Sequence, residues 1–126
     1  MSNIKILIVD DSDIDRMILK NILSQSYDVI EANSGFSAIE ILNNFSIQID
    51  ALMLDISMPG MDGFATLDLT NRTRLMSMPV YLIAAETQTE NIKKAVNYGV
   101  TCFLKKPYGS TLILSKLKTF FDRKKI

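Results

Sequence analysis

Histidine is absent from the 126-residue chain, and so is tryptophan. Without an imidazole the chain cannot build a Ser-His-Asp or Cys-His nucleophile of its own. Any chemistry that needs a histidine must therefore come from a partner protein. Cysteine occurs once, as Cys102, which excludes an internal disulfide framework and fits a reducing compartment.

An excess of charge of either sign is also lacking, because 14 Lys and Arg residues balance 14 Asp and Glu residues. The chain offers no overall field that would attract nucleic acid or an anionic membrane, and no basic stripe for DNA is present. No apolar run approaches the roughly 20 residues of a membrane-spanning helix, and the N-terminal pattern is not that of a signal peptide. We expect a cytoplasmic protein with no nucleic-acid or membrane partner.

What is present is a globular composition, with 48% hydrophobic residues in a length typical of one domain. Short apolar runs rich in branched side chains alternate with segments of helical spacing. The runs predict strands over residues 5–9, 27–32, 51–54, 80–84 and 102–104. This alternation predicts an α/β fold, a doubly wound parallel sheet of five strands with helices on both faces.

The intervening segments carry the capping residues and apolar spacing of helices. Ser12 with Asp15, and Thr87 with Glu90, have the spacing of capping boxes. The other predicted cap positions are Gly99 and Ser110, and Asn33-Ser34-Gly35 opens the second predicted helix. The predicted apolar positions are Ile14, Met17, Ile18 and Ile22; Ala38, Ile41, Leu42 and Phe45; Phe64, Leu67 and Asn71 in a shorter helix; Ile92, Ala95 and Val96; and Ile113, Leu117, Phe120 and Phe121.

Charged side chains follow three of the predicted strands. Asp10 and Asp11 end the first strand, Asp55 ends the third before a loop broken by proline and glycine, and Lys106 follows the fifth. In a parallel sheet these positions share the edge where ligands bind. Three adjacent carboxylates repel one another unless a cation offsets them, and Mg²⁺ suits oxygen ligands. Lys106 is placed to bind a phosphoryl oxygen. A carboxylate beside Mg²⁺ and an ammonium is the combination that forms an aspartyl-phosphate.

Each motif alone has a plainer interpretation. Asp-Asp-Ser before a helix is most often cap chemistry, Asp55 alone is most often a turn former, and Lys105-Lys106 alone is usually a solvated pair. Their shared position at the ends of strands one, three and five favours a functional site over these separate interpretations.

Three stretches together resemble the receiver domain of response regulators, the CheY-like family. They are ILIVDDS (6–12), MLDISMPGMDG (53–63) and FLKKP (103–107), in this order, and the resemblance covers essentially the whole chain. It implies a flavodoxin-like sheet of strand order 2-1-3-4-5 and a single receiver domain over residues 1–126.

The resemblance also implies roles for the acidic residues. Asp55 would be the phosphoacceptor in two-component signalling. Asp11 would bind Mg²⁺ directly and Asp10 mainly through water, with Asp55 and the backbone carbonyl of Ser57 as further ligands. Mn²⁺ is an alternative ion.

Lys106 would contact the phosphoryl group, and its bond to Pro107 would be cis. The donor would be a phosphohistidine on a histidine kinase or phosphotransfer protein, which agrees with the absence of histidine here. A downstream effector or output domain would read the signal, and homodimerisation is left open. The chain would not be an enzyme beyond its own phosphoryl uptake and loss at Asp55.

One position departs from the family pattern. The family ends strand four in a Ser or Thr that bonds the phosphoryl group, whereas this chain has Ala84 followed by Ala85. A hydrogen bond to a charged group is worth about 1.5–3 kcal/mol. One interpretation is that a nearby hydroxyl, such as that of Thr87, or a water molecule makes this hydrogen bond instead. The other is that phosphorylation is only weakly coupled to the position of Phe103, the switch residue of the family. In the second case the chain is a pseudo-receiver, a constitutive interaction module.

A phosphatase or transferase with an aspartate nucleophile is the third class of function. Such enzymes commonly carry a second acid two residues after the nucleophile, and Ser57 occupies that place here. The sequence therefore disfavours a multi-turnover enzyme.

Overall fold

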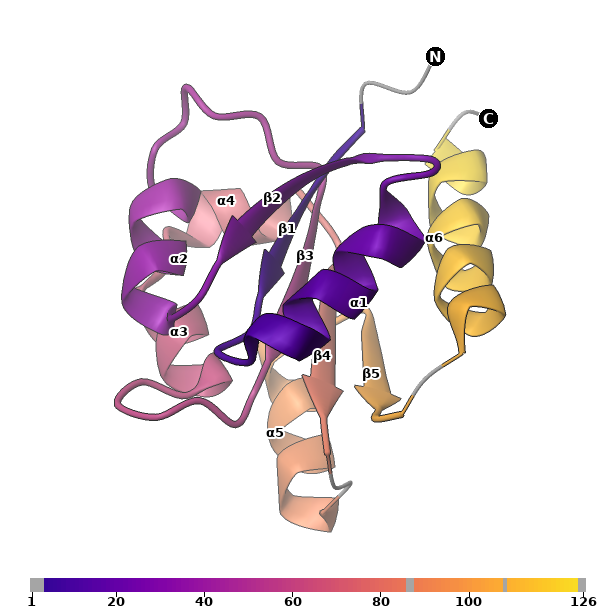
Figure 1. Cartoon of the computed structure of the whole chain (residues 1–126). Coiled ribbons are helices and arrows are strands. Elements are labelled where there is room, and N and C mark those ends of the chain that lie inside the picture. The colour runs from indigo at the N-terminus through magenta and orange to yellow at the C-terminus, as the bar shows by residue number, and fades with distance from the viewer. Residues whose placement is uncertain (1–3, 86–87, 108, 125–126) are drawn as a thin grey trace.

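Five parallel strands form the centre of the molecule (Figure 1), in a computed structural model that describes residues 4–85, 88–107 and 109–124. The strands are β1 (Lys5–Val9), β2 (Asp28–Ala32), β3 (Ala51–Asp55), β4 (Val80–Ala84) and β5 (Cys102–Lys105). They lie in the order β2-β1-β3-β4-β5, and every neighbouring pair is parallel. The predicted fold and strand order are confirmed.

Helices cover both faces of the sheet, as Figure 1 shows. The helices are α1 (Asp13–Leu23), α2 (Gly35–Leu42), α3 (Gly63–Leu69), α4 (Arg72–Met76), α5 (Thr89–Tyr98) and α6 (Ser110–Lys124). Side chains of α1 and α6 pack on one face, and those of α2, α3 and α5 pack on the other. Among the described residues, no helix combines the length and the apolar character that crossing a membrane requires.

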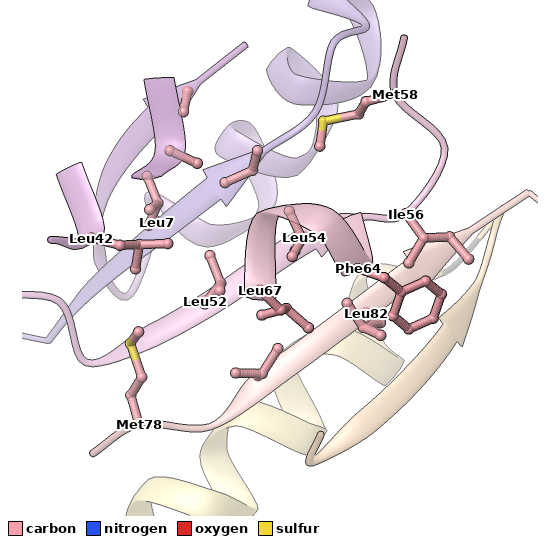
Figure 2. Close-up of a cluster of buried hydrophobic side chains, with 14 of the residues drawn as sticks. Leu7, Leu42, Leu52, Leu54, Ile56, Met58, Phe64, Leu67, Met78 and Leu82 are labelled. Atoms are coloured by element: carbon pink, nitrogen blue, oxygen red, sulfur yellow. The ribbon is translucent and has the colours of Figure 1, made fainter. Parts of the chain in front are cut away.

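Alternation along each strand divides the core into these two layers. In β1, Ile6 and Ile8 face the α1 and α6 layer, whereas Leu7 and Val9 face the α2, α3 and α5 layer. Figure 2 shows leucines of several strands meeting side chains from α2 and α3 in the second layer. Full burial of one such side chain stabilises the fold by about 1.5–3 kcal/mol. Together these side chains hold the sheet in place, and the charged residues Asp10, Asp55 and Lys106 lie at its carboxyl edge.

The strand ends differ slightly from the predicted ones. Tyr27 was expected in the second strand, but its N–H donates to the carbonyl of Leu23 at the end of α1, 2.9 Å away, and β2 begins at Asp28. Lys105 lengthens β5 by one residue. The central strands β3 and β4 are buried along their whole length, as expected of strands covered on both faces.

The predicted third helix is wrong as a single helix, because it breaks into α3 and α4. Asn71, predicted within it, is instead the N-cap of α4. The side chain of Asn43 bridges the break: its amide donates to the Leu69 carbonyl at 3.2 Å and its carbonyl accepts from the Asn71 N–H at 2.7 Å. Both backbone groups freed by the break are thereby satisfied.

Of the apolar stripe predicted for α1, only Ile22 packs against the core. Ile14, Met17 and Ile18 are exposed, whereas Leu19 and Leu23 are buried. Apolar residues lie on more than one side of this helix, so their spacing predicted the helix correctly but not its buried face.

Three more predicted core positions lie at the surface. Phe45 follows the end of α2 and is exposed, and the Arg74 guanidinium lies 5.3 Å from its ring centroid. In α5, Ala95 is buried, but Ile92 and Val96 are exposed. The core-facing residues of α6 are buried or half-buried as predicted: Ile113, Leu117, Phe120 and Phe121.

Capping predictions had mixed outcomes. Gly99 ends α5 in the left-handed region, φ +72°, as predicted for a C-cap. Thr87 lies outside the described residues; α5 begins after Gln88, which makes no side-chain cap bond. Ser110 is the first residue of α6 and does not precede it.

Candidate functional site

Charged side chains from three strand ends meet at one edge of the sheet. One oxygen from each of Asp10, Asp11 and Asp55 can be chosen so that all three lie within 4.8 Å of one another. The Lys106 ammonium lies 3.0 Å from Asp10 Oδ2 and 3.3 Å from Asp55 Oδ2. The residues proposed for the site are therefore neighbours in space, and the Lys106–Pro107 bond is cis, as the resemblance implied.

The turn after β1 orients its two aspartates differently. Asp10 is buried, and its Oδ1 accepts from the Ser12 N–H at 2.9 Å. Arg16 donates to the Asp10 carbonyl at 2.9 Å, which fixes the turn against the first helix. Asp11 is exposed. The pair thus places one carboxylate inside the site and one at its mouth.

Asp55 is held at the end of β3 with one oxygen committed to the backbone. The Ser57 N–H donates to Asp55 Oδ1 at 3.0 Å, while Oδ2 faces Lys106. Burial, the largest cause, and the charge of Asp10 together raise the pKa of Asp55 to about 6, against the opposing effects of the Ser57 N–H and Lys106. A carboxylate that is this poorly solvated favours a partner that carries positive charge.

Lys106 contacts a fourth carboxylate that the sequence did not place in the site. Asp15 Oδ2 lies 2.8 Å from Lys106 Nζ, closer than either Asp10 or Asp55. Burial alone would lower the pKa of Lys106, but hydrogen bonds to Asp15 and Asp10, together with the charge of Asp55, raise it above its ordinary value. Lys106 is therefore a fixed cation at this edge of the sheet.

Asp15 was predicted only as half of a capping box, and half of that box forms. The Asp15 N–H donates to Ser12 Oγ at 3.2 Å, but the Ser12 N–H bonds Asp10 and not the side chain of Asp15. The available signal was its place in the first turn of the helix that directly follows Asp10 and Asp11.

Ala84 is buried at the end of β4, opposite Lys105 of β5, and it offers no hydroxyl. Phe103 is half-buried and packs against the layer formed by α2, α3 and α5. Because Thr87 lies outside the described residues, its hydroxyl stays an untested substitute.

A family model for the response regulator receiver domain matches residues 6–118. The chain belongs to this family. Receiver domains of two-component systems generally carry a phosphoryl group on an aspartate and bind Mg²⁺ at an acidic pocket. This receiver domain has a cluster of three acidic residues, Asp10, Asp11 and Asp55, at the carboxyl edge of its sheet.

Chemotaxis proteins are among the relatives of this receiver domain. It is 34% identical over 122 residues to the chemotaxis protein CheY of Pseudomonas aeruginosa, covering 94% of this chain and 97% of that protein. It is 35% identical over 127 residues to CheY-3 of Vibrio cholerae, covering 96% and 94%. A CheY-like receiver domain from Methanospirillum hungatei superposes with a TM-score of 0.88 at 25% identity, covering 98% of each chain. Vibrio cholerae CheY4 superposes with a TM-score of 0.83 at 26% identity, covering 94% of this chain and 98% of that one.

The residues of the pocket fit a hard divalent cation. Asp10 and Asp55 are buried and form a cluster with the exposed Asp11, and the Lys106 ammonium contacts Asp10, Asp55 and Asp15. Carboxylate oxygens are the ligands that Mg²⁺ prefers, so the receiver domain has the right donor set.

The raised pKa of Asp55 predicts a pH-dependent stability of this receiver domain. The folded-state pKa of about 6 exceeds the model-peptide value of 3.8, so burying the ionised carboxylate destabilises the fold as pH rises through 6. Asp55→Asn, which cannot ionise, should match the wild type in free energy of unfolding below pH 4 and exceed it by roughly 3 kcal/mol above pH 7. Urea unfolding in EDTA at several pH values measures this difference, and a difference that does not change with pH would contradict the prediction.

Proposed function

We propose that this receiver domain accepts a phosphoryl group on Asp55 from a phosphohistidine of a separate histidine kinase or phosphotransfer protein. It then relays the signal through contact with a downstream effector or output domain. The observation that carries this proposal is the position of Asp55, buried at the carboxyl edge of the sheet between the acidic pair and Lys106.

The two oxygens of Asp55 have different surroundings, which suggests the acceptor atom. Oδ1 is held by the Ser57 N–H, so Oδ2, which lies 3.3 Å from the Lys106 ammonium, is the oxygen that attacks phosphorus. An O–P bond forms as the N–P bond of the phosphohistidine breaks, and its electron pair stays on the imidazole nitrogen. Lys106 donates to the phosphoryl oxygens and offsets their charge. The imidazole comes from the donor, because this chain has no histidine.

We also propose Asp10, Asp11 and Asp55 as the residues that hold Mg²⁺, or Mn²⁺ as an alternative, with the carbonyl of Ser57 as a further ligand. When bound, the ion supplies positive charge beside the transferred phosphoryl group. Asp10 and Asp11 act by holding that charge, and Asp55 has the separate role of nucleophile.

The wild-type domain tests the proposal directly. With Mg²⁺ and acetyl phosphate as a small donor, the intact protein should gain the mass of one phosphoryl group, and EDTA should prevent the gain. Amide NMR signals of β4 and β5 should shift at the same time, since this face would carry the signal. A protein that gains no phosphoryl group under these conditions would contradict the proposal.

A second candidate, a pseudo-receiver acting as a constitutive interaction module, is favoured by the buried Ala84 at the end of β4. Uptake of phosphate with unchanged NMR signals of β4 and β5 would support this candidate. Repeated hydrolysis of a small phosphoester would instead support the enzyme class that Ser57 disfavours.

A further inference from the structure

Lys106 has all of its hydrogen-bonding capacity committed to carboxylates. Its ammonium contacts Asp15 at 2.8 Å, Asp10 at 3.0 Å and Asp55 at 3.3 Å. An ammonium has three protons, so each carboxylate takes one. To donate to a phosphoryl oxygen on Asp55, Lys106 must give up at least one of these contacts.

Asp15 differs from Asp10 and Asp55, the other two partners of Lys106, because it is not part of the cluster that could bind a metal ion. The group of three carboxylates that can share a cation consists of Asp10, Asp11 and Asp55. Its charge therefore stays on Lys106 whether or not that group is neutralised. When a cation occupies that group, the contact with Asp15 is therefore the one that remains to compete with an incoming phosphoryl group.

The fold holds Asp15 where this competition is effective. Its N–H is fixed by Ser12 Oγ in the first turn of α1, and the neighbouring Arg16 anchors that turn to the Asp10 carbonyl. The side chains of Asp15 and Lys106 are 38% and 20% exposed. A half-buried ion pair is screened less by solvent and salt than one at an open surface.

We propose that Asp15 is a positioning residue, which holds the Lys106 ammonium on the α1 side of the site and competes for it with phosphoryl oxygens on Asp55. This inference rests on the proposed phosphorylation at Asp55. Its consequence is that Asp15 disfavours the phosphorylated form, because the Asp15–Lys106 contact must lengthen or break when Lys106 turns to the phosphoryl group.

Beryllium trifluoride, a stable mimic of a phosphoryl group on a carboxylate, tests the competition without turnover. In titrations with saturating Mg²⁺ followed by amide NMR, Asp15→Asn and Asp15→Ala should bind it about three- to tenfold more tightly than the wild type, the value of one released ion pair. Asp13→Asn is the matched control, because it removes the same charge from the same helical turn. Asp13 pairs with Arg16, at 2.7 Å, and not with Lys106. It should leave the affinity unchanged.

The Lys106→Met background separates an effect through Lys106 from simple charge repulsion. There, Asp15→Asn should change the beryllium trifluoride affinity by less than about twofold, since no ammonium remains to release. Undiminished tightening in that background, tightening by Asp13→Asn, or unchanged affinity in both Asp15 variants would each overturn the role of Asp15. A wild type that binds no beryllium trifluoride and takes up no phosphate would instead contradict the proposed function itself.

Discussion

Asp55→Asn should gain no phosphoryl group from a phosphohistidine or from acetyl phosphate, even with saturating Mg²⁺. An amide oxygen is not a nucleophile for phosphorus under these conditions, whereas a carboxylate oxygen can be. The shape of the site should survive, because the Asn side-chain carbonyl can still accept the Ser57 N–H that now bonds Asp55 Oδ1. Intact-protein mass after incubation measures the loss, and an unfolding curve confirms that the variant is folded.

Asp62→Asn is the matched control for this substitution. Asp62 lies at the far end of the loop that follows β3, is exposed, and caps α3 by accepting the Ala65 N–H at 2.8 Å. Asn is as good an N-cap as Asp, so uptake and stability should both stay near wild type. A phosphoryl group that appears on Asp55→Asn as readily as on Asp62→Asn would place the acceptor elsewhere.

The convergence of the charged groups was predictable because it follows from one topological rule. Asp10 and Asp55 come directly after apolar runs and Lys106 follows the fifth strand, and parallel strands bring such positions to one edge. The rule needs only the existence and direction of the strands. It tolerates the error of one residue at the start of β2, which carries none of these groups, and at the end of β5, because Lys106 still follows that strand.

The contact between Asp15 and Lys106 was not predictable in the same way. It joins residues 91 apart in the chain, and the local role of Asp15 near Ser12 already accounted for an acid at that position. Which side of α1 faces the sheet decides where the Asp15 side chain lies. That orientation was predicted wrongly from Ile14, Met17 and Ile18, because apolar residues also occupy other sides of the helix.

The break between α3 and α4 shows a second limit. The segment from Phe64 to Asn71 has helical spacing, and nothing local requires it to stop at Leu69. The break is stabilised from outside by the side chain of Asn43, which lies at the end of α2 and satisfies the backbone groups on both sides. Local propensity cannot anticipate a partner supplied by tertiary packing.

Gly63→Ala should destabilise the domain by about 3 kcal/mol, although helix propensity predicts the opposite sign. Gly63 is the first residue of α3, where alanine would by itself be the better helix former. A Cβ there would lie 2.8 Å from the Ile56 Cα and 2.9 Å from the Asp55 carbonyl oxygen, and both are backbone atoms with little freedom to move. Urea unfolding of the variant measures which effect is larger.

Gly109→Ala provides the comparison, because a Cβ at Gly109 would meet no atom within 4 Å. Its stability should be unchanged or higher by about 0.4–1 kcal/mol, from the lower entropy of the unfolded chain.

The atoms that Gly63→Ala would displace adjoin the Asp55 carboxylate, and the Gly63 N–H also bonds the Ile56 carbonyl at 3.0 Å. The variant should therefore weaken Mg²⁺ binding in the fraction that stays folded, measured by titration of the amide NMR signals. If the Gly63→Ala domain is as stable as the Gly109→Ala domain, the backbone of the loop after β3 can shift at little cost in free energy. Close packing of this loop against α3 would then not be what positions Asp55.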